Sequence, residues 1–585
     1  MKTSELLCAG VALALACVCN ADGGPNASDA FPTETLRLTT QGPAAAGCEP
    51  TWESLARRPM PQWYADAKFG IFCHWGFQCA AECGDWYAKN LYNAEHRQGR
   101  FHRKTYGDPA EFGAKDLIPQ WKGEKWKADE LCALYKRMGA RYIVAMANHH
   151  DNFDNWDSTH QPWNSVRMGP KRDVLAEWAD AARKNGLRFG ESFHAAHAQM
   201  WYECARDADG LVAKEAGKGK WWEGEDPQLL YRQAAHAPMD DWRNPKAVHY
   251  AWHWGSAATP PGADFVENVR LRMNEAIAKY RPDIIYFDDT AVPFWPVSDA
   301  GLRVVADYYN LNPDGVATGK ILTDEQRRAL VWDVERGTPP TPIFPHWQTD
   351  TCIGAWHYDR EIYEKNRYKS AARVLQTLAD VVSKNGNLCL SIPIRSDGTI
   401  DEKERAVCED IADWMAVNGE AIFDTVPHSV CGEGPQLENA PPLSAQGFNE
   451  NKIPPATVRD IRYTATKDGR TVYAIVLKPP ADGETPAFTA LAAERIANVE
   501  RLKQVKDMPA VFKVTLRAPL LAGFNPDPSI CRVALLRRRQ LLPSARAGRY
   551  GMGTSGSRRS ALRPEDAQSL QRPHGRHVLP GKVDA

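Results

Sequence analysis

Acids and histidines stand directly after short apolar runs of this chain, where a folded protein can use them for chemistry. The run Ile284–Phe287 is preceded by Pro282 and followed by Asp288 and Asp289. A short, continuously apolar run is typical of a parallel strand that is buried on both faces. In an α/β barrel the active site lies at the carboxyl ends of the strands, so acids there are placed for catalysis. The alternative is that the two acids only cap the following helix.

Histidines follow three further apolar runs. His74 ends the first, His149 and His150 follow the second, and His194 ends the third. Neighbouring residues of a strand point to opposite faces, so His149 and His150 do not readily bind one metal ion unless they lie in a loop. A neutral imidazole offers one hydrogen-bond donor and one acceptor, which suits the hydroxyl groups of a sugar. These histidines therefore indicate a sugar site rather than a metal site.

Alternating strands and helices must position these residues. Apolar spacing predicts helices over 127–139, 173–185, 263–280, 370–383 and 402–417, and further strands over 330–335, 347–354 and 385–393. This alternation favours an α/β fold, and we assign residues 61–425 to a (β/α)8-like TIM barrel. The long segment 195–262 carries several tryptophans among charged residues, and we expect a lid or a long loop between a strand and a helix.

The N-terminal residues predict export. Lys2 precedes an apolar stretch over residues 6–16, so residues 1–21 are predicted to be a signal peptide and residues 22–60 a linker. We therefore expect a periplasmic, cell-surface or extracellular protein. No other apolar run approaches the ~20 residues that a membrane span needs. The net charge of -1 over 585 residues favours neither nucleic acid nor an anionic membrane as a partner.

The C-terminal part changes character twice. Residues 461–465 and 471–477 alternate like antiparallel strands, and residues 426–520 are predicted to form a second domain, a β domain. Residues 521–533 form a separate short motif. Residues 534–585 are rich in Arg, Ser and Gly without apolar periodicity, so we predict a disordered tail that catalysis does not need.

Several motifs in a fixed order make the chain resemble the α-L-fucosidases, family 29 of the glycoside hydrolases, over residues 65–425. They are Lys68–Gly76, Asn148–Asp151, Gly169–Asp173, Ile285–Asp288, the region of Trp347 and Trp356, and Lys384–Leu388. The resemblance implies that residues 426–520 are a shortened form of that family's β-sandwich. Separately, Gly523–Arg532 resembles the opening of family 43 glycosidases, in which Asp527 would be a general base. The propeller blades that would follow are missing, which a frameshift or a truncated fusion would explain.

The resemblance also implies an activity. A family member cleaves terminal α-L-fucosyl residues from fucosylated oligosaccharides or glycoconjugates with retention of configuration, without a cofactor or metal. It implies Asp288 as the nucleophile, and it implies that His74, Asp85, Trp86, His149, His150 and His194 hold the fucosyl ring. The chain departs from the family at Asp85 (usually Glu), at Asn152 (usually Gly) and at His194, which stands in place of a tyrosine-rich strand end.

The general acid is harder to assign, because in the family it lies on a variable stretch after the nucleophile. We choose Glu335, which ends what we take to be the strand after Asp288 and has Arg336 beside it to tune its pKa. Glu361 and Asp350 are the alternatives, and Glu191 is a weaker one.

Two other functions stay open. The first is a metal-dependent hydrolase that uses His74, His149, His150 and Asp288, although the helical histidine pairs of many such enzymes are missing. The second is an inactive carbohydrate-binding protein, which the unusual C-terminus favours and the acids at 288 and 335 disfavour. The sequence leaves the linkage, the aglycone and the oligomeric state open.

Overall fold

The computed structural model describes residues 47–206, 213–232, 260–288, 291–443, 447–481, 484 and 486–520. The predicted signal peptide, the motif 521–533, the tail 534–585 and Asp289 lie outside these residues. The end of the predicted linker does not, because residues 47–60 belong to the folded unit. There Thr51 caps a short helix, α1 (Trp52–Leu55), and apolar Leu55 is buried. Folded structure thus begins before the predicted boundary at residue 61.

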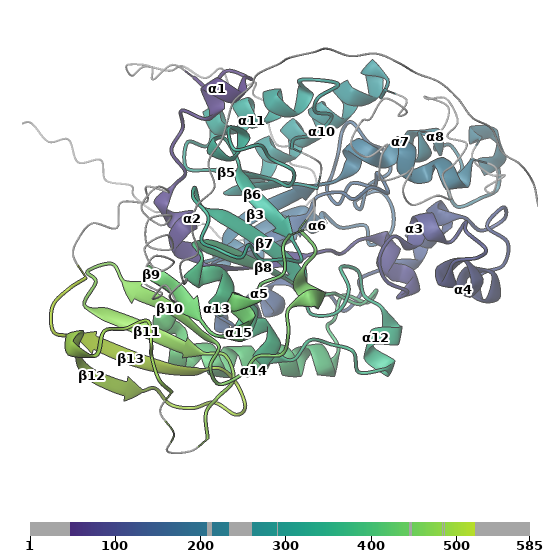
Figure 1. Ribbon diagram of the computed structural model, residues 1–585. Helices are drawn as coiled ribbons and strands as arrows, with labels where there is room; N and C mark the ends of the chain where they lie inside the picture. The colour runs from purple at the N-terminus through teal and green to yellow at the C-terminus, as the bar shows by residue number, and fades with distance from the viewer. Residues whose placement is uncertain are drawn as a thin grey trace, which may run out of the picture. The chain divides into compact units, whose positions relative to one another are not determined.

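Eight parallel strands close into a barrel (Figure 1), as predicted. They are β1 (Phe69–Cys73), β2 (Tyr142–Met146), β3 (Arg188–Phe193), β4 (Ile284–Phe287), β5 (Val316–Gly319), β6 (Val331–Glu335), β7 (Trp347–Cys352) and β8 (Gly386–Ser391). Strand β8 pairs with β1 and completes the closure. Seven of the eight fall on predicted runs, and β5 is the one that the sequence analysis missed. Glu335 therefore ends the second strand after β4, not the next one.

Helices cover the outside of the barrel (Figure 1). The long ones are α5 (Ala128–Arg137), α6 (Val174–Lys184), α10 (Ala263–Tyr280), α11 (Ala300–Leu311), α13 (Ala371–Ser383) and α14 (Glu402–Asn418). Their starts follow local chemistry, since Asp173 and Ser370 each accept a hydrogen bond from a backbone N–H of the first turn. Five of these six helices match the predicted ranges, and α11, which precedes β5, was not predicted.

The segment between β3 and α10 is a long βα loop with short helices of its own. Its described parts include α7 (Ala198–Trp201) and α8 (Gln228–Tyr231). In Figure 1 these helices lie on the same side of the barrel as α3 (Tyr87–Asn90) and α4 (Arg97–Thr105), which follow β1. Both groups follow the carboxyl ends of barrel strands, where the candidate catalytic residues lie.

The second domain is a five-stranded antiparallel sheet in the order β12-β13-β11-β10-β9. Its strands are β9 (Thr425–Glu433), β10 (Ile461–Thr466), β11 (Thr471–Val476), β12 (Ile496–Arg501) and β13 (Ala510–Leu516). Buried Arg462 on β10 contacts Asp380 on α13 at 2.5 Å, and Trp414 on α14 donates to the Pro509 carbonyl at 2.8 Å. Within the described residues, barrel helices thus supply the layer that packs against this sheet.

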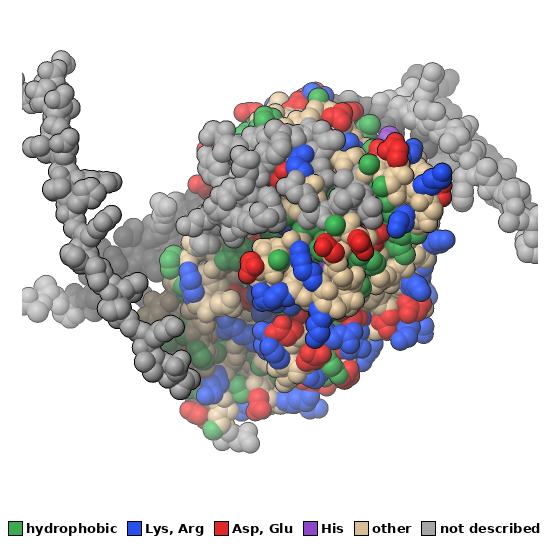
Figure 2. Space-filling model, turned by 90° about the vertical axis from the view of Figure 1, so that its right-hand side faces the viewer, with side chains coloured by type: hydrophobic (Ala, Val, Ile, Leu, Met, Phe, Trp, Pro, Cys, Tyr) green, Lys and Arg blue, Asp and Glu red, His purple; other side chains and the backbone are tan. Residues whose placement is uncertain are grey.

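The surface carries both signs of charge. On the face shown in Figure 2, Lys and Arg side chains are interspersed with Asp and Glu, in keeping with the net charge of -1. Among the described residues, no helix combines the length and the apolar character needed to cross a membrane.

Candidate active site

Asp288 stands directly after β4 and is held by three side chains from different elements. Its Oδ2 lies 3.1 Å from His194 Nδ1 and 3.2 Å from His150 Nε2. Its Oδ1 lies 2.9 Å from Nζ of Lys320, the residue that follows β5. The Asp288 side chain is still 22% exposed, so a substrate can reach it. This is the position expected for a nucleophile at the carboxyl end of a barrel strand.

Glu335, at the end of β6, contacts the same ammonium group. Lys320 Nζ donates to Glu335 Oε2 at 2.5 Å. The distance between Asp288 Oδ1 and Glu335 Oε2 therefore cannot exceed the sum of their two distances to Lys320 Nζ. That limit falls within the ~5–5.5 Å separation of carboxyl groups in retaining glycosidases and below the ~6.5–9.5 Å of inverting ones.

The surroundings drive the two pKa values in opposite directions. Burial tends to raise the pKa of Asp288, but the Lys320 cation and the hydrogen bonds from His194 and His150 outweigh it and hold that pKa well below its usual range. For Glu335 burial prevails and raises the pKa to about 7, against the opposing effect of Lys320. One carboxyl is thus an anion and the other a proton carrier near neutral pH, as nucleophile and general acid require.

Three of the predicted sugar-binding histidines form one cluster. The His194 ring lies 4.9 Å from the His149 ring and 5.4 Å from the His74 ring, measured between centroids. Burial holds the pKa of His74 and of His149 well below the usual value, so both are neutral. In the described part of the chain, His74 Nδ1 is buried without a hydrogen-bond partner.

Asp85 and Trp86 reach the same region through other residues. Asp85 Oδ1 accepts a hydrogen bond from the backbone N–H of His357 at 2.6 Å. The Trp86 ring meets the His150 ring edge-on, with 6.2 Å between the centroids. Beside His357, the Trp356 ring packs 5.1 Å from His74. His150 and His194 thus contact Asp288 directly, whereas Asp85 is joined to it only through His357 and the histidine cluster.

The three alternative acids have different surroundings. Glu361 pairs with Lys365, which is the main reason that its pKa is lowered, and no contact joins it to Asp288 among the described residues. Asp350 is only 1% exposed and lies inside the barrel, so it cannot reach a leaving group. Glu191 is fully buried, and no described group hydrogen-bonds to either of its carboxyl oxygens. None of the three combines exposure, a raised pKa and proximity to Asp288.

A hydrogen-bonded layer inside the barrel supports Lys320 from below. The Tyr286 hydroxyl donates to Asp350 Oδ2 at 2.7 Å, and that oxygen lies 3.8 Å from Lys320 Nζ. Gln348 donates to Asp333 at 2.8 Å and accepts from Tyr64 at 2.6 Å. Burial raises the pKa of Asp350 well above its usual value and that of Asp333 to about 6.

Lys320 is the important residue that the sequence analysis missed. It follows Val316-Ala-Thr-Gly319, a strand of four mostly small residues that carries little apolar signal. The number of strands offered a clue, because a closed barrel of eight strands requires one more strand between β4 and residue 330. Lys320 directly follows Val316–Gly319, the strand that was missing. His357 was missed for a similar reason, since it stands in an irregular segment after β7 that has no periodicity.

Comparison of the sequence with known proteins finds a family and relatives of similar sequence. A model of the α-L-fucosidase family matches residues 36–420. Plasma α-L-fucosidase of Rattus norvegicus is 26% identical over 469 residues, which cover 78% of this chain and 85% of the relative. Tissue α-L-fucosidase of Homo sapiens is 27% identical over 462 residues, covering 75% and 81%.

A solved structure shares the fold. The α-fucosidase of Thermotoga maritima in complex with fucose has a TM-score of 0.57 and 24% identity, and the match covers 80% of this chain and 95% of that one. The family match spans well over half of the sequence and includes the whole barrel. This chain belongs to the α-L-fucosidase family of glycoside hydrolases.

Proposed function

We propose that this protein removes terminal α-L-fucosyl residues from fucosylated oligosaccharides or glycoconjugates, with Asp288 as the nucleophile and Glu335 as the acid/base. The observation that carries the proposal is the Lys320 ammonium, which contacts both carboxyl groups, at 2.9 Å and 2.5 Å. Contact with one shared ammonium supports the short separation of carboxyl groups that double displacement needs.

In the first step the Asp288 carboxylate attacks the anomeric carbon and the glycosidic C–O bond breaks. Glu335 gives its proton to the departing oxygen, so a fucosyl ester forms on Asp288 and Glu335 becomes an anion. Lys320 keeps one anionic partner throughout, since Asp288 loses its charge as Glu335 gains one. The neutral histidines His74 and His149 would bind the sugar hydroxyl groups.

In the second step Glu335 takes a proton from a water molecule, which attacks the same carbon. The ester bond breaks, fucose leaves with its original configuration, and Asp288 is again a carboxylate. The barrel layer beneath Lys320 keeps that ammonium in place during both steps.

The direct test is to incubate the purified protein with an aryl α-L-fucoside and, separately, with the matching aryl α-galactoside. We expect aryl alcohol to be released from the fucoside only. An inactive carbohydrate-binding protein would bind fucose without turnover. Turnover of the galactoside alone would contradict the proposal.

A metal-dependent hydrolase is the second candidate, because ligand nitrogens of His74, His149 and His194 lie within 4.8 Å of one another. The neutral imidazoles fit a transition metal chemically, whereas the Lys320 cation on the neighbouring carboxylate opposes one. Dialysis against a chelator distinguishes the two functions, and we expect activity to survive it. We also propose that the protein is exported, on the apolar stretch at residues 6–16.

A further inference from the structure

Asn152 has a left-handed backbone conformation in the loop that carries the catalytic histidines. Its φ is +63°, in the region that Gly adopts freely and Asn tolerates better than most residues. The fucosidases that this chain resembles usually have Gly at this position. Gly would satisfy the backbone, so the side chain that Asn adds calls for an explanation.

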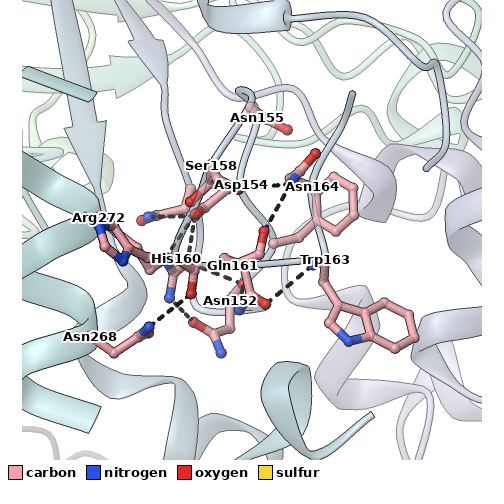
Figure 3. Close-up of polar contacts among 12 residues, drawn as sticks. Asn152, Asp154, Asn155, Ser158, His160, Gln161, Trp163, Asn164, Asn268 and Arg272 are labelled. Carbon is pink, nitrogen blue, oxygen red and sulfur yellow. Dashed lines mark hydrogen bonds and ion pairs between the residues drawn. The ribbon is translucent and has the colours of Figure 1, made fainter. Parts of the chain in front are cut away.

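The side-chain oxygen of Asn152 accepts a hydrogen bond from a buried arginine. Arg272 of α10 is 0% exposed, and its guanidinium donates to Asn152 Oδ1 at 2.6 Å and to the Asn152 carbonyl at 3.2 Å. The same guanidinium pairs with Asp154, with one contact at 2.9 Å. Figure 3 shows Arg272 reaching from its helix to both residues of the loop. A buried ion pair is tolerated only when such hydrogen bonds satisfy it.

The side-chain nitrogen of Asn152 donates to the long βα loop between β3 and α10. Asn152 Nδ2 donates to the carbonyl of Leu229 at 3.1 Å and to that of Leu230 at 2.9 Å, both in α8. Gln161 Nε2 bridges the same two segments, at 3.1 Å to the Asn152 carbonyl and 3.0 Å to the Leu229 carbonyl. One side chain thus joins three elements: the histidine loop, α10 and α8.

From the Arg272–Asp154 pair, hydrogen bonds lead to the nucleophile. Asp154 Oδ1 accepts from Asn148 Nδ2 at 3.1 Å, and Asn148 Oδ1 accepts from the backbone N–H of His194 at 3.1 Å. The His194 carbonyl in turn accepts from His150 Nδ1 at 2.7 Å. Both histidines contact Asp288 Oδ2. A shift of the loop would therefore move the two groups that orient the nucleophile.

We propose that Asn152 is a positioning residue for the fucosidase reaction, which ties the loop of His149 and His150 to α10 and to the insert helix α8. The inference rests on the proposed function. The Arg272–Asp154 pair fixes the loop from one side, and the Leu229 and Leu230 carbonyls fix it from the other. Asn152 touches neither Asp288 nor Glu335 in any contact of the described residues, so it acts only through the histidines.

The test compares Asn152→Gly with wild type on an aryl α-L-fucoside, with rates normalised to the concentration of titrated active sites. Gly keeps the left-handed backbone and removes the side-chain bonds alone. We expect kcat to fall and KM to rise, together lowering kcat/KM by about tenfold, because His150 and His149 are no longer held. If kcat per titrated active site and KM are both unchanged, even with a lower Tm, the role of Asn152 is merely structural and the proposal is overturned.

Two further variants sharpen the test. Asn152→Asp keeps an acceptor for Arg272 but supplies no N–H to the α8 carbonyls, so it should behave like Asn152→Gly. Wild-type kinetics in Asn152→Asp would overturn the tie to α8. Asn268→Ala is the matched control, because Asn268 lies on the same helix as Arg272 and donates to the His160 carbonyl of the same loop at 2.9 Å (Figure 3). It should leave kcat and KM unchanged, and a tenfold loss there would refute a specific role for Asn152.

Wild-type inactivity on the fucoside would instead refute the proposed function itself.

Discussion

Asp288 and Glu335 contact the same ammonium group, that of Lys320, at 2.9 Å and 2.5 Å. The three residues end consecutive strands β4, β5 and β6 or stand directly after them. Parallel strands of a barrel end at the same rim, so residues far apart in the chain meet there. The shared cation couples the two carboxyl groups, because any change in the charge of one alters the proton affinity of the other.

Replacing the nucleophile should abolish turnover without unfolding the protein. We expect Asp288→Asn to lower kcat by about 10³-fold or more, since the covalent route is lost. The amide has nearly the same shape, so thermal unfolding should show a folded protein. Steady-state kinetics on an aryl α-L-fucoside gives the answer. If the variant keeps more than about a tenth of the wild-type rate, Asp288 is not the nucleophile.

Replacing the general acid should depend on the leaving group. Glu335→Gln cannot protonate a poor leaving group, so turnover of a fucosylated sugar should fall by about 10²–10⁴-fold. An activated aryl fucoside needs little protonation, so formation of the fucosyl-enzyme from it should fall far less. Glu361→Gln is the control and should leave both substrates unaffected. The reverse pattern would move the acid/base role to Glu361.

The pH dependence of kcat/KM should be set by the two carboxyl groups. Glu335 must be protonated to donate, and its pKa is raised to about 7 by burial, so activity should fall as the pH rises through about 7. Asp288 must be ionised, and its pKa lies well below the usual range, so the loss on the acidic side should come only at low pH. A rate profile across pH measures both limbs. An alkaline limb that persists in Glu335→Gln would assign it to another group.

Removing the Lys320 cation should shift both limbs of the pH profile of kcat/KM in the same direction. Lys320→Met deletes the charge that lowers the pKa of Asp288 and of Glu335, so both limbs should move to higher pH and kcat/KM at low pH should decrease. Lys369→Met is the control, because Lys369 pairs with Glu450 at 2.5 Å rather than with the catalytic carboxyls. Limbs that stay in place in Lys320→Met would show that the cation does not set these pKa values.

Much of the barrel could be predicted because its buried strands are continuously apolar. Ile284–Phe287 is such a run, and the position of Asp288 follows from it. Strand β5 was not predicted because Val316–Gly319 is a short run of mostly small residues that resembles a turn. Lys320, which follows this strand, was missed for the same reason. The interior residues Asp333 and Gln348 were also unforeseen, since a polar barrel interior breaks the apolar pattern of its strands. Contacts between strand ends depend on barrel closure, which no local pattern contains.

The measurement that tests the account most directly is the configuration of the first sugar released. An aryl α-L-fucoside is mixed with the protein in a proton NMR tube, and the anomeric signals are followed before mutarotation equilibrates them. The close approach of Asp288 and Glu335 through Lys320 predicts that α-L-fucose appears first. If β-L-fucose appears first, displacement is single, the two carboxyls do not act as nucleophile and acid/base, and the central claim is contradicted.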